Sequence, residues 1–299
     1  MLSELVHQMK ASHCSLDYSP TRLFKDVFDS VGPSFMALIN LCLRTGSVPD
    51  AFKKVIVQPL LKKSNLDPLV FSNFKPVSKL SFMSKVLEKI VFIQLQSFLA
   101  GNGIEEQFQS GFKSKHSTES ALLKISNDIL LARDTGDSVL LVLLYLTAAF
   151  DTVDHEILLS PLEQCVGIQG TVLNWFRSYL TNRSFTVNIG SCSSSSTILS
   201  CGVPQGSVLG PILFSLCMLP LGSVLRKHGF CFYRYADGIQ IYLPLKATRG
   251  MSLQPLFDCL TDLKSWLALN FLNVNENKTE CVLFGDLVNL TSSDQGLGP

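Results

Sequence analysis

The chain has 299 residues, of which 46% are hydrophobic and 16% are charged, and its formal net charge is +1. This composition supports a folded core and excludes a disordered chain. The near-zero charge lacks the basic excess of a dedicated nucleic-acid binder, although it is compatible with a local basic groove. The nine cysteines lie at least nine positions apart, which excludes CxxC zinc-ligand spacing and indicates reduced, intracellular thiols.

Residues 1–50 are expected to be helical. Apolar residues at helical spacing follow Ser19-Pro20, and a second helix is expected to begin after Pro33. The lysine-flanked stretch "KKVIVQPLLKK" predicts a strand, and Pro76 keeps "NFKPVSKL" extended. The apolar spacing from Met83 to Leu99 predicts a long helix.

The apolar run "VLLVLLYL", Val139 to Leu146, is the strongest strand signal. It is too short to cross a bilayer as a helix and predicts a strand buried on both faces. Asp151 and Asp154 follow it and suit a helix N-cap and first turn. The pair Asp237-Gly238, between two β-prone runs, predicts a hairpin turn. Other expected elements are helices near 121–133, 171–180, 207–219 and 252–268, a hairpin in "SFTVNIGSCSSSSTILS", and a strand before Gly285.

Four segments carry side chains suited to chemistry, and each also has a plainer explanation. Asp237 displays an acid at a hairpin tip, although an aspartate there often only makes the turn. In "CGVPQGSVLGP" the glycines around Gln205 let the backbone approach a ligand closely, or the segment is an ordinary irregular loop. In "LLYLTAAFDTVDH" Tyr145 and Phe150 lie near a strand end, where ligands bind in open sheets, or Tyr145 is only core. In "ENKTE" Lys278 precedes a strand, or it is only a solvated lysine.

Together, and in this order, these segments resemble the reverse transcriptase domain of non-LTR (LINE-type) retrotransposons, and most closely that of fish-type elements. The resemblance extends from about Leu16 to Gly285. It is carried by the blocks "NFKPVSKLSFMSKVLEKIV", "QSGFKSKHSTESALL", "LTAAFDTVDHEILL", "SCGVPQGSVLGPILFSL", "YRYADGIQIYLPL" and "LNVNENKTECVLFG". Six blocks in a fixed order are a highly specific signal.

The resemblance implies an α+β fold with the fingers and palm of a right-hand polymerase. The palm is expected to be an antiparallel sheet with helices packed on one face. The implied boundaries are a helical N-terminal extension at 1–60, fingers at 61–138, a palm at 139–285 and a loose tail at 286–299. Because that tail is too short to form a thumb, the thumb is expected to be missing.

The resemblance also implies RNA-directed DNA polymerase activity, a nucleotidyl transfer that uses Mg²⁺. Two metal ions in such a site need carboxylates that bridge both of them. In the family one essential aspartate ends the buried strand, as in "LLDLSAAFD", and two more stand together as "YADD". Here Tyr145 and Gly238 replace two of these three aspartates, and Asp237 remains as the only expected metal ligand. A neutral phenol is a poor Mg²⁺ ligand, so this copy is expected to be catalytically inactive, with its Mg²⁺ binding in doubt.

Other family positions are kept. Phe150 matches the aromatic residue that crowds the sugar 2′ position and selects deoxynucleotides. Gln205 and Gly206 match the loop that packs against the template base and the incoming nucleotide. Lys278 matches a lysine that can protonate the pyrophosphate leaving group.

Two lysines stand where the family commonly has arginine. Lys75 and Lys113 keep the positive charge but lose the bidentate fork of a guanidinium. The resemblance therefore implies weak binding of an RNA template and a DNA primer through lysines such as Lys75, Lys113 and Lys115. No membrane partner is expected, the location is expected to be intracellular, and the oligomeric state is left open.

Three interpretations stay open from the sequence. The chain is a reverse transcriptase domain by descent that has lost catalysis, a module repurposed for RNA or protein binding on the same fold, or a working polymerase. Under the first, Tyr145 and Asp237 should face each other across adjacent strands, with Gly238 at the turn and Phe150 lining the same cleft. Asp151 is expected to be only a helix cap.

Overall fold

The computed structural model describes residues 2–104, 106–113, 115–245 and 253–285. Its chain forms two compact units, each built from two separate segments. The first unit joins residues 1–104 to 150–217, and the second joins 105–149 to 218–299. These units divide the chain at other positions than the expected boundaries near 60, 138 and 285, so the assignment of ranges to fingers and palm stays a prediction. The expected loose tail, 286–299, lies outside the described residues.

The helices of the first unit match the expected positions except around Pro33. The expected start after Pro33 is wrong, because α3 runs from Phe28 to Thr45 with Pro33 inside it. Tertiary packing overrides the local effect of the proline: Phe28 and Phe35 are both buried, and the Phe24 ring contacts theirs at 5.7 and 5.6 Å. The other helical segments of this unit are α1 (Leu2–Gln8), α2 (Thr21–Asp26), η1 (Asp50–Phe52), η2 (Phe71–Asn73), α4 (Phe82–Asn102), α7 (His155–Gln164), α8 (Gly170–Leu180) and α9 (Gly210–Cys217), with α6 (Ala149–Thr152) where the chain passes from one unit to the other.

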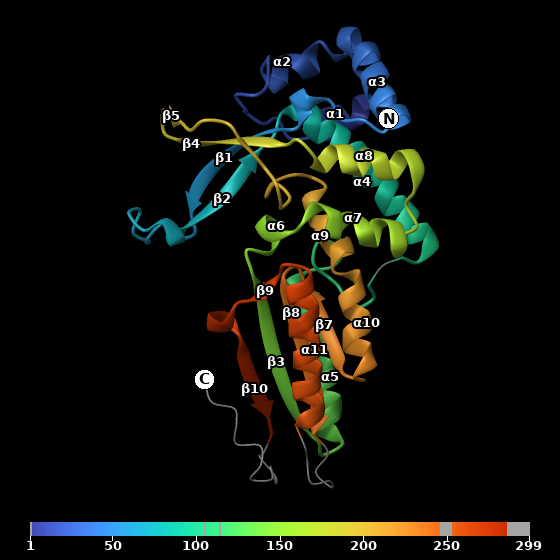
Figure 1. The fold of residues 1–299 in the computed structure, drawn as a ribbon, viewed down its shortest axis with the longest axis vertical. Coiled ribbons are helices and arrows are strands. Elements are labelled where there is room, and N and C mark those ends of the chain that lie inside the picture. Colours follow the sequence, from blue (N-terminus) through green and yellow to red (C-terminus); the bar gives the residue numbers. More distant parts are fainter. Residues whose placement is uncertain (1, 105, 114, 246–252, 286–299) are drawn as a thin grey trace. The chain divides into compact units, whose positions relative to one another are not determined.

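A mixed sheet forms the rest of the first unit (Figure 1). The expected strand in "KKVIVQPLLKK" is β1 (Lys54–Leu61), and it pairs antiparallel with β2 (Phe74–Lys79). On its other side β1 pairs in parallel with β4 (Ser184–Ile189). The short strands β5 (Cys192–Ser193) and β6 (Thr197–Ile198) both pair with β4 and make the expected serine-rich hairpin.

The sheet of the second unit is antiparallel, in the order β10-β3-β8-β7. Its central strand is the expected apolar run, which extends one residue further at each end, from Ser138 to Thr147. β3 lies between β8 (Gly238–Leu245) and β10 (Glu280–Phe284), and β7 (Cys231–Tyr235) pairs with the other edge of β8. The short strand β9 (Asn273–Val274) pairs with the end of β3.

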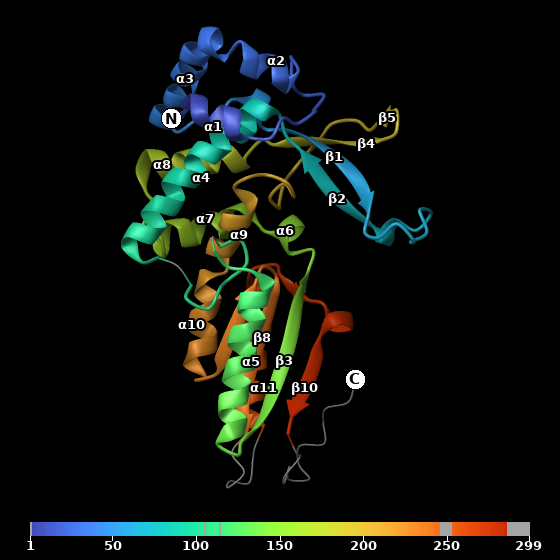
Figure 2. The same ribbon diagram turned by 180° about the vertical axis from the view of Figure 1, so that it is seen from behind.

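Helices cover both faces of this sheet. We expected them on one face; instead α5 (Thr118–Asp134) and α11 (Gln254–Leu269) lie on opposite faces, as Figures 1 and 2 show. Side chains alternate along a strand, so odd-numbered residues of β3 such as Val139 and Leu141 pack in the cluster with α5. The even-numbered residues point to the other face, which carries α11 and the shorter helix α10 (Leu219–Lys227). The expected α+β class is confirmed, and β3 is buried on both faces as expected.

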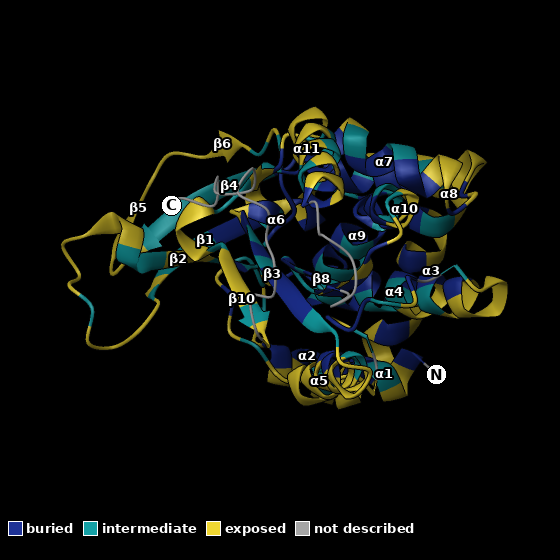
Figure 3. Cartoon of the chain, turned by 90° about the horizontal axis from the view of Figure 1, so that it is seen from below, coloured by how far each residue is buried: buried dark blue, intermediate teal, exposed yellow. Residues whose placement is uncertain are grey.

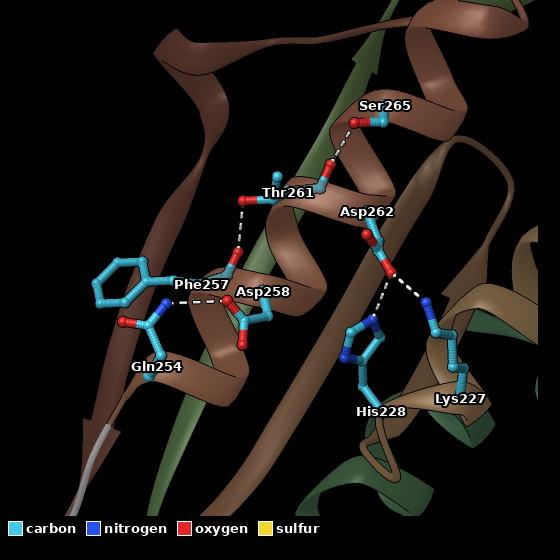
Figure 4. Close-up of polar contacts among 8 residues, drawn as sticks. All are labelled: Lys227, His228, Gln254, Phe257, Asp258, Thr261, Asp262 and Ser265. Atoms are coloured by element: carbon cyan, nitrogen blue, oxygen red, sulfur yellow. Dashed lines mark hydrogen bonds and ion pairs between the residues drawn. The ribbon is translucent and has the colours of Figure 1, made fainter.

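Charged groups connect α10 to α11. The Asp262 carboxylate on α11 accepts hydrogen bonds from the Lys227 ammonium at 2.8 Å and pairs with the His228 ring at 3.0 Å (Figure 4). These two contacts hold the pKa of Asp262 below its ordinary value, the bond from Lys227 being the larger cause. Further along α11, the Thr261 and Ser265 hydroxyls donate to backbone carbonyls one turn earlier. This outer surface of α11 is therefore an ordinary solvated helix face.

Candidate functional site

The end of β3 lies beside the hairpin that carries Asp237. Tyr145 is paired with Gly238 in the β3–β8 ladder, and the Leu146 N–H donates to the Asp237 carbonyl at 3.2 Å. Asp237, next to Gly238, therefore lies beside the end of β3. That its side chain faces the side chain of Tyr145 stays a prediction. Both side chains are half-buried.

The hairpin tip is one residue earlier than expected. Tyr235 pairs with Gly238 across the hairpin, so the two-residue loop is Ala236-Asp237 and Gly238 is the first residue of β8. The positive φ of 55° belongs to Ala236, at the first loop position, where a type II′ turn requires it. The expectation of Gly238 at the turn is wrong, because the same glycine is held in the ladder with Tyr145. Asp237 is displayed at the tip.

The missing side chain of Gly238 matters for packing. A Cβ atom at this buried position would lie 3.4 Å from Cε1 of Tyr145, 3.3 Å from the Tyr235 carbonyl oxygen and 3.2 Å from Nε2 of Gln240. The phenol ring of Tyr145 thus borders the space that an aspartate at 238 would need. Tyr145 and Gly238, the two positions where the resemblance leads us to expect aspartate, are thus direct neighbours across the β3–β8 ladder.

Gly111, which was not singled out in the sequence, packs against the backbone of the hairpin loop that carries Asp237. A Cβ on Gly111 would lie 2.2 Å from the backbone nitrogen of Ala236, so only glycine fits. The segment before it lines the free edge of β7: the Ser110 N–H donates to the Arg234 carbonyl at 3.1 Å, and the Arg234 N–H donates to the Phe108 carbonyl at 2.7 Å. The signal available was "QSGF", one of the resemblance blocks. Lys113, half-buried, and Lys115, exposed, follow two and four residues later.

Lys278 lies in the segment that follows β9. That strand pairs with Leu146 and Thr147 at the end of β3, and the Asn275 N–H donates to the Tyr145 carbonyl at 2.7 Å. Lys278 is the last residue of the short helical turn η3 (Glu276–Lys278), and its side chain is exposed. The second unit thus brings the segments of Tyr145, Asp237 and Lys278 to one end of the sheet.

The remaining expected residues belong to the first unit. The Gln205 carbonyl accepts the Ser78 N–H at 2.7 Å, and its side-chain amide donates to Asp151 Oδ2 at 2.9 Å. Gly206 has φ +118°, and a Cβ there would lie 2.6 Å from the Ser78 carbonyl oxygen. The backbone of the "PQG" loop therefore packs directly against β2, and the close approach of residue 206 to Ser78 requires a glycine.

Asp151 is not the expected helix cap. It lies within the short helix α6, where it accepts the bond from Gln205, and burial raises its pKa above the ordinary value. The cap is Asp154, whose Oδ1 accepts the N–H groups of Glu156 and Ile157 at 2.9 and 3.0 Å and opens α7. Sequence alone could not choose between two acids three positions apart.

A cavity of about 290 Å³ lies between the sheet and the "PQG" loop, entirely within the first unit. Asp151 and Gln205 supply polar atoms to otherwise largely apolar walls. Its lining comes from β1, β2, β4 and the loop: Val55, Val57, Pro76, Ser78, Phe185, Val187, Leu199, and residues 201–205.

Two other expected residues lie away from that lining. Lys75, exposed on β2, alternates with Pro76, so its side chain emerges from the opposite face of the sheet from the cavity. The ring of Phe150 is half-buried and packs on Phe214 at 4.6 Å. Phe150 belongs to the first unit and Tyr145 to the second, so a shared cleft stays a prediction.

A buried acid, also missed in the sequence, anchors the chain after the "PQG" loop. Glu88 on α4 is 1% exposed, and its Oε2 accepts the Val208 N–H at 2.6 Å while its Oε1 accepts the Tyr179 hydroxyl at 3.2 Å. Burial raises the pKa of Glu88, and the nearby Arg183 charge opposes that rise. The available signal was an acid on the apolar face of an otherwise core-forming helix.

The comparisons with known proteins define the class. The family described as "Reverse transcriptase (RNA-dependent DNA polymerase)" matches residues 60–295. The chain therefore belongs to the reverse transcriptase family.

Two relatives place it more closely. It is 29% identical over 255 residues to "Probable RNA-directed DNA polymerase from transposon BS" of Drosophila melanogaster, covering 82% of this chain and 27% of that protein. It is 28% identical over 293 residues to "RNA-directed DNA polymerase from mobile element jockey" of Drosophila funebris, covering 96% of this chain and 32% of the relative. The expected type, a reverse transcriptase domain of a LINE-type element, is confirmed; the fish-type origin stays a prediction.

The fold has a solved counterpart. An apo telomerase from Candida tropicalis, truncated from its C-terminal domain, matches with a TM-score of 0.56 at 12% identity, covering 88% of this chain and 56% of that one. At this identity the likeness shows the fold alone, and it is consistent with the fingers and palm of a polymerase. None of the helices in the described part of the chain combines the length and hydropathy needed to span a bilayer.

The donor atoms beside Asp237 do not fit a pair of divalent cations. Mg²⁺ takes hard oxygen ligands, and a two-metal site needs carboxylates that bridge both ions. At this strand end the neighbouring positions supply a phenol, Tyr145, and a residue without a side chain, Gly238. Within the described ranges, no three histidine, cysteine, aspartate or glutamate side chains are grouped as a metal site would require.

Proposed function

We propose that this chain is a reverse transcriptase domain by descent that no longer transfers nucleotides. The observation that carries the proposal is the pairing of Tyr145 with Gly238 next to Asp237. Two of the three positions that hold metal in the family's motif pattern lack a carboxylate, and the third stands alone at the hairpin tip. Each catalytic ligand lost is expected to raise the barrier by several kcal/mol, and about 1.4 kcal/mol is a tenfold loss of rate.

The residues that bind the template and the nucleotide in the family are proposed to be partly kept in this chain. Gln205 and Gly206 are held in the conformation that a close backbone approach needs, beside a cavity with a polar end. We assign Phe150 the selection of the sugar and Lys278 the protonation of pyrophosphate in the ancestral reaction. Lys75 emerges from the sheet face opposite to the cavity, which favours a phosphate contact outside it.

RNA binding is the activity proposed to remain. It is expected to be weak, without sequence preference, and carried by lysines such as Lys75, Lys113 and Lys115. Lysine–phosphate contacts release counterions, so the affinity should fall steeply with added salt. Mg²⁺, which the family uses, should have little effect on it because Asp237 is a lone ligand.

Two assays on the purified chain test the proposal. Mg²⁺-dependent primer extension on an RNA template should give no product, whereas product formation would show that the metal ligands are wrongly assigned. Crosslinking to RNA should give a signal that disappears at high salt. A tight, salt-independent complex would instead favour a repurposed binding module.

A further inference from the structure

The loop between β1 and β2 presents three consecutive large apolar side chains to solvent. We call residues 62–73 the tip loop. Leu69 is 85% exposed, Val70 43% and Phe71 91%. Figure 3 shows the far end of the β1–β2 hairpin coloured as exposed. Contiguous exposed apolar side chains mark interaction sites on protein surfaces more often than scattered ones do.

The tip loop is ordered by its own hydrogen bonds. Oδ1 of Asp67 accepts the Leu69 N–H at 2.8 Å, and the Asp67 carbonyl accepts the side-chain amide of Asn73 at 2.9 Å. The Lys62 N–H donates to the Asn73 carbonyl at 2.8 Å and closes the base of the loop. A loop ordered in this way loses less conformational entropy when a ligand binds. The exposed apolar side chains of the tip loop are therefore held on an ordered backbone before any ligand binds.

The charge of the hairpin points to an anionic partner. Residues 54–79 contain five lysines and a single acid, Asp67, although the whole chain has a net charge of only +1. The remainder of the chain is therefore net negative. Lys62 and Lys63 are exposed within the tip loop, and Lys75 is exposed on β2, where it pairs with Leu60. An aromatic ring among lysines is the combination that holds single-stranded nucleic acid, whose bases stack while its phosphates contact the cations.

We propose that the tip loop binds single-stranded RNA by stacking an unpaired base on the ring of Phe71, with Lys62 and Lys63 against the neighbouring phosphates. The inference rests on the proposed RNA binding and names a contact and a substrate form for it. Bases in a duplex already stack on each other, so the ring should distinguish single-stranded from double-stranded RNA. Stacking is tolerant of sequence because every base has a π-face.

The test uses the full chain and two RNA probes, a labelled oligouridylate and a blunt RNA duplex of the same length. Phe71→Ala should weaken oligouridylate binding roughly 5- to 150-fold, the range for removing one stacking ring, and should leave duplex binding unchanged. Tyr18→Ala is the matched control, because Tyr18 is a 99% exposed aromatic residue outside the hairpin. Phe71→Trp should keep the affinity, and oligouridylate should quench the fluorescence of the new indole.

Salt dependence separates stacking from charge. Phe71→Ala should leave the slope of log affinity against log salt unchanged, whereas Lys63→Ala should reduce it by about 0.7. If the parent binds oligouridylate and Phe71→Ala binds equally well, this inference fails while the proposed RNA binding stands. If the parent binds neither probe at low salt, the proposed RNA binding fails as well. Phe71-dependent retention on phosphatidylserine vesicles, with RNA affinity unchanged, would overturn the inference in favour of a lipid surface.

Discussion

Replacing Gly238 by aspartate should destabilise the second unit by about 2–6 kcal/mol. Overpacking costs about 1–3 kcal/mol, because the new Cβ would lie 3.2 Å from Nε2 of Gln240 and 3.3 Å from the Tyr235 carbonyl oxygen, and the Tyr145 ring borders the space for the atoms beyond it. A desolvated carboxylate without a partner adds a penalty of about 1–3 kcal/mol, here next to the Tyr235 carbonyl oxygen at 3.3 Å from the Cβ position. No backbone term is expected, since Gly238 does not have positive φ.

Gly238→Asn separates the effect of added side-chain bulk on stability from the effect of added charge. Combining it with Tyr145→Asp tests whether the Tyr145 ring contributes to the cost of the bulk. The asparagine variant keeps the added bulk and should lose only the overpacking part, about 1–3 kcal/mol. In a Tyr145→Asp background the ring is gone, so the same asparagine should cost about 1 kcal/mol less, within the range for residues in contact. The assay is urea unfolding with hydrogen exchange of the β3 and β8 amides. Equal losses in both backgrounds would refute the argument that the Tyr145 ring limits the space for a side chain at position 238.

Three further predictions concern supporting residues. Gly111→Ala should displace the hairpin tip, because its Cβ would lie 2.2 Å from the Ala236 nitrogen; faster exchange of tip amides would show this, and unchanged exchange would contradict it. Gly206→Ala should break the close contact with the Ser78 carbonyl and also strain a positive φ, so the melting temperature should fall; an unaltered melt would be inconsistent with the 2.6 Å approach. Because the folded pKa of Glu88 is raised by burial, its stabilising effect is complete below the ordinary glutamate pKa of about 4.3 and is lost as pH rises through the folded pKa. Urea midpoints of the parent should therefore fall with rising pH more than those of Glu88→Gln, and parallel pH profiles would rule this out.

Much of the fold could be predicted because its signals are local. The strand at 139–146 was expected from an apolar run, and it is found at Ser138–Thr147. The hairpin that carries Asp237 was expected from composition, but its loop position was not, since ladder pairing with β3 decides it. The helix through Pro33 was missed because the packing of Phe28 and Phe35 against Phe24 of the preceding helix overrides a local breaker.

The site was predictable where it depends on motif order and not where it depends on contacts between segments. The segments of Tyr145 and Asp237 were expected to be neighbours, and the pairing of Tyr145 with Gly238 places them so; that the two side chains face each other stays a prediction. The partner of Asp151 could not be foreseen, because Gln205 is far away in the sequence. Gly111 and Glu88 were overlooked for the same reason: a glycine behind a turn and an acid under a loop have meaning only once their neighbours are known.

Restoring the carboxylates and measuring primer extension tests the central claim most directly. The variants are Tyr145→Asp, Gly238→Asp and the double variant, each assayed with Mg²⁺ on an RNA template beside the parent. Residues that hold one metal pair act as a unit, so the parent and both single variants should give no product. The double variant, which again has three carboxylates with Asp237, should be the first to extend a primer, and only weakly. Product from the parent or from either single variant would contradict the assignment of these positions as the lost metal ligands.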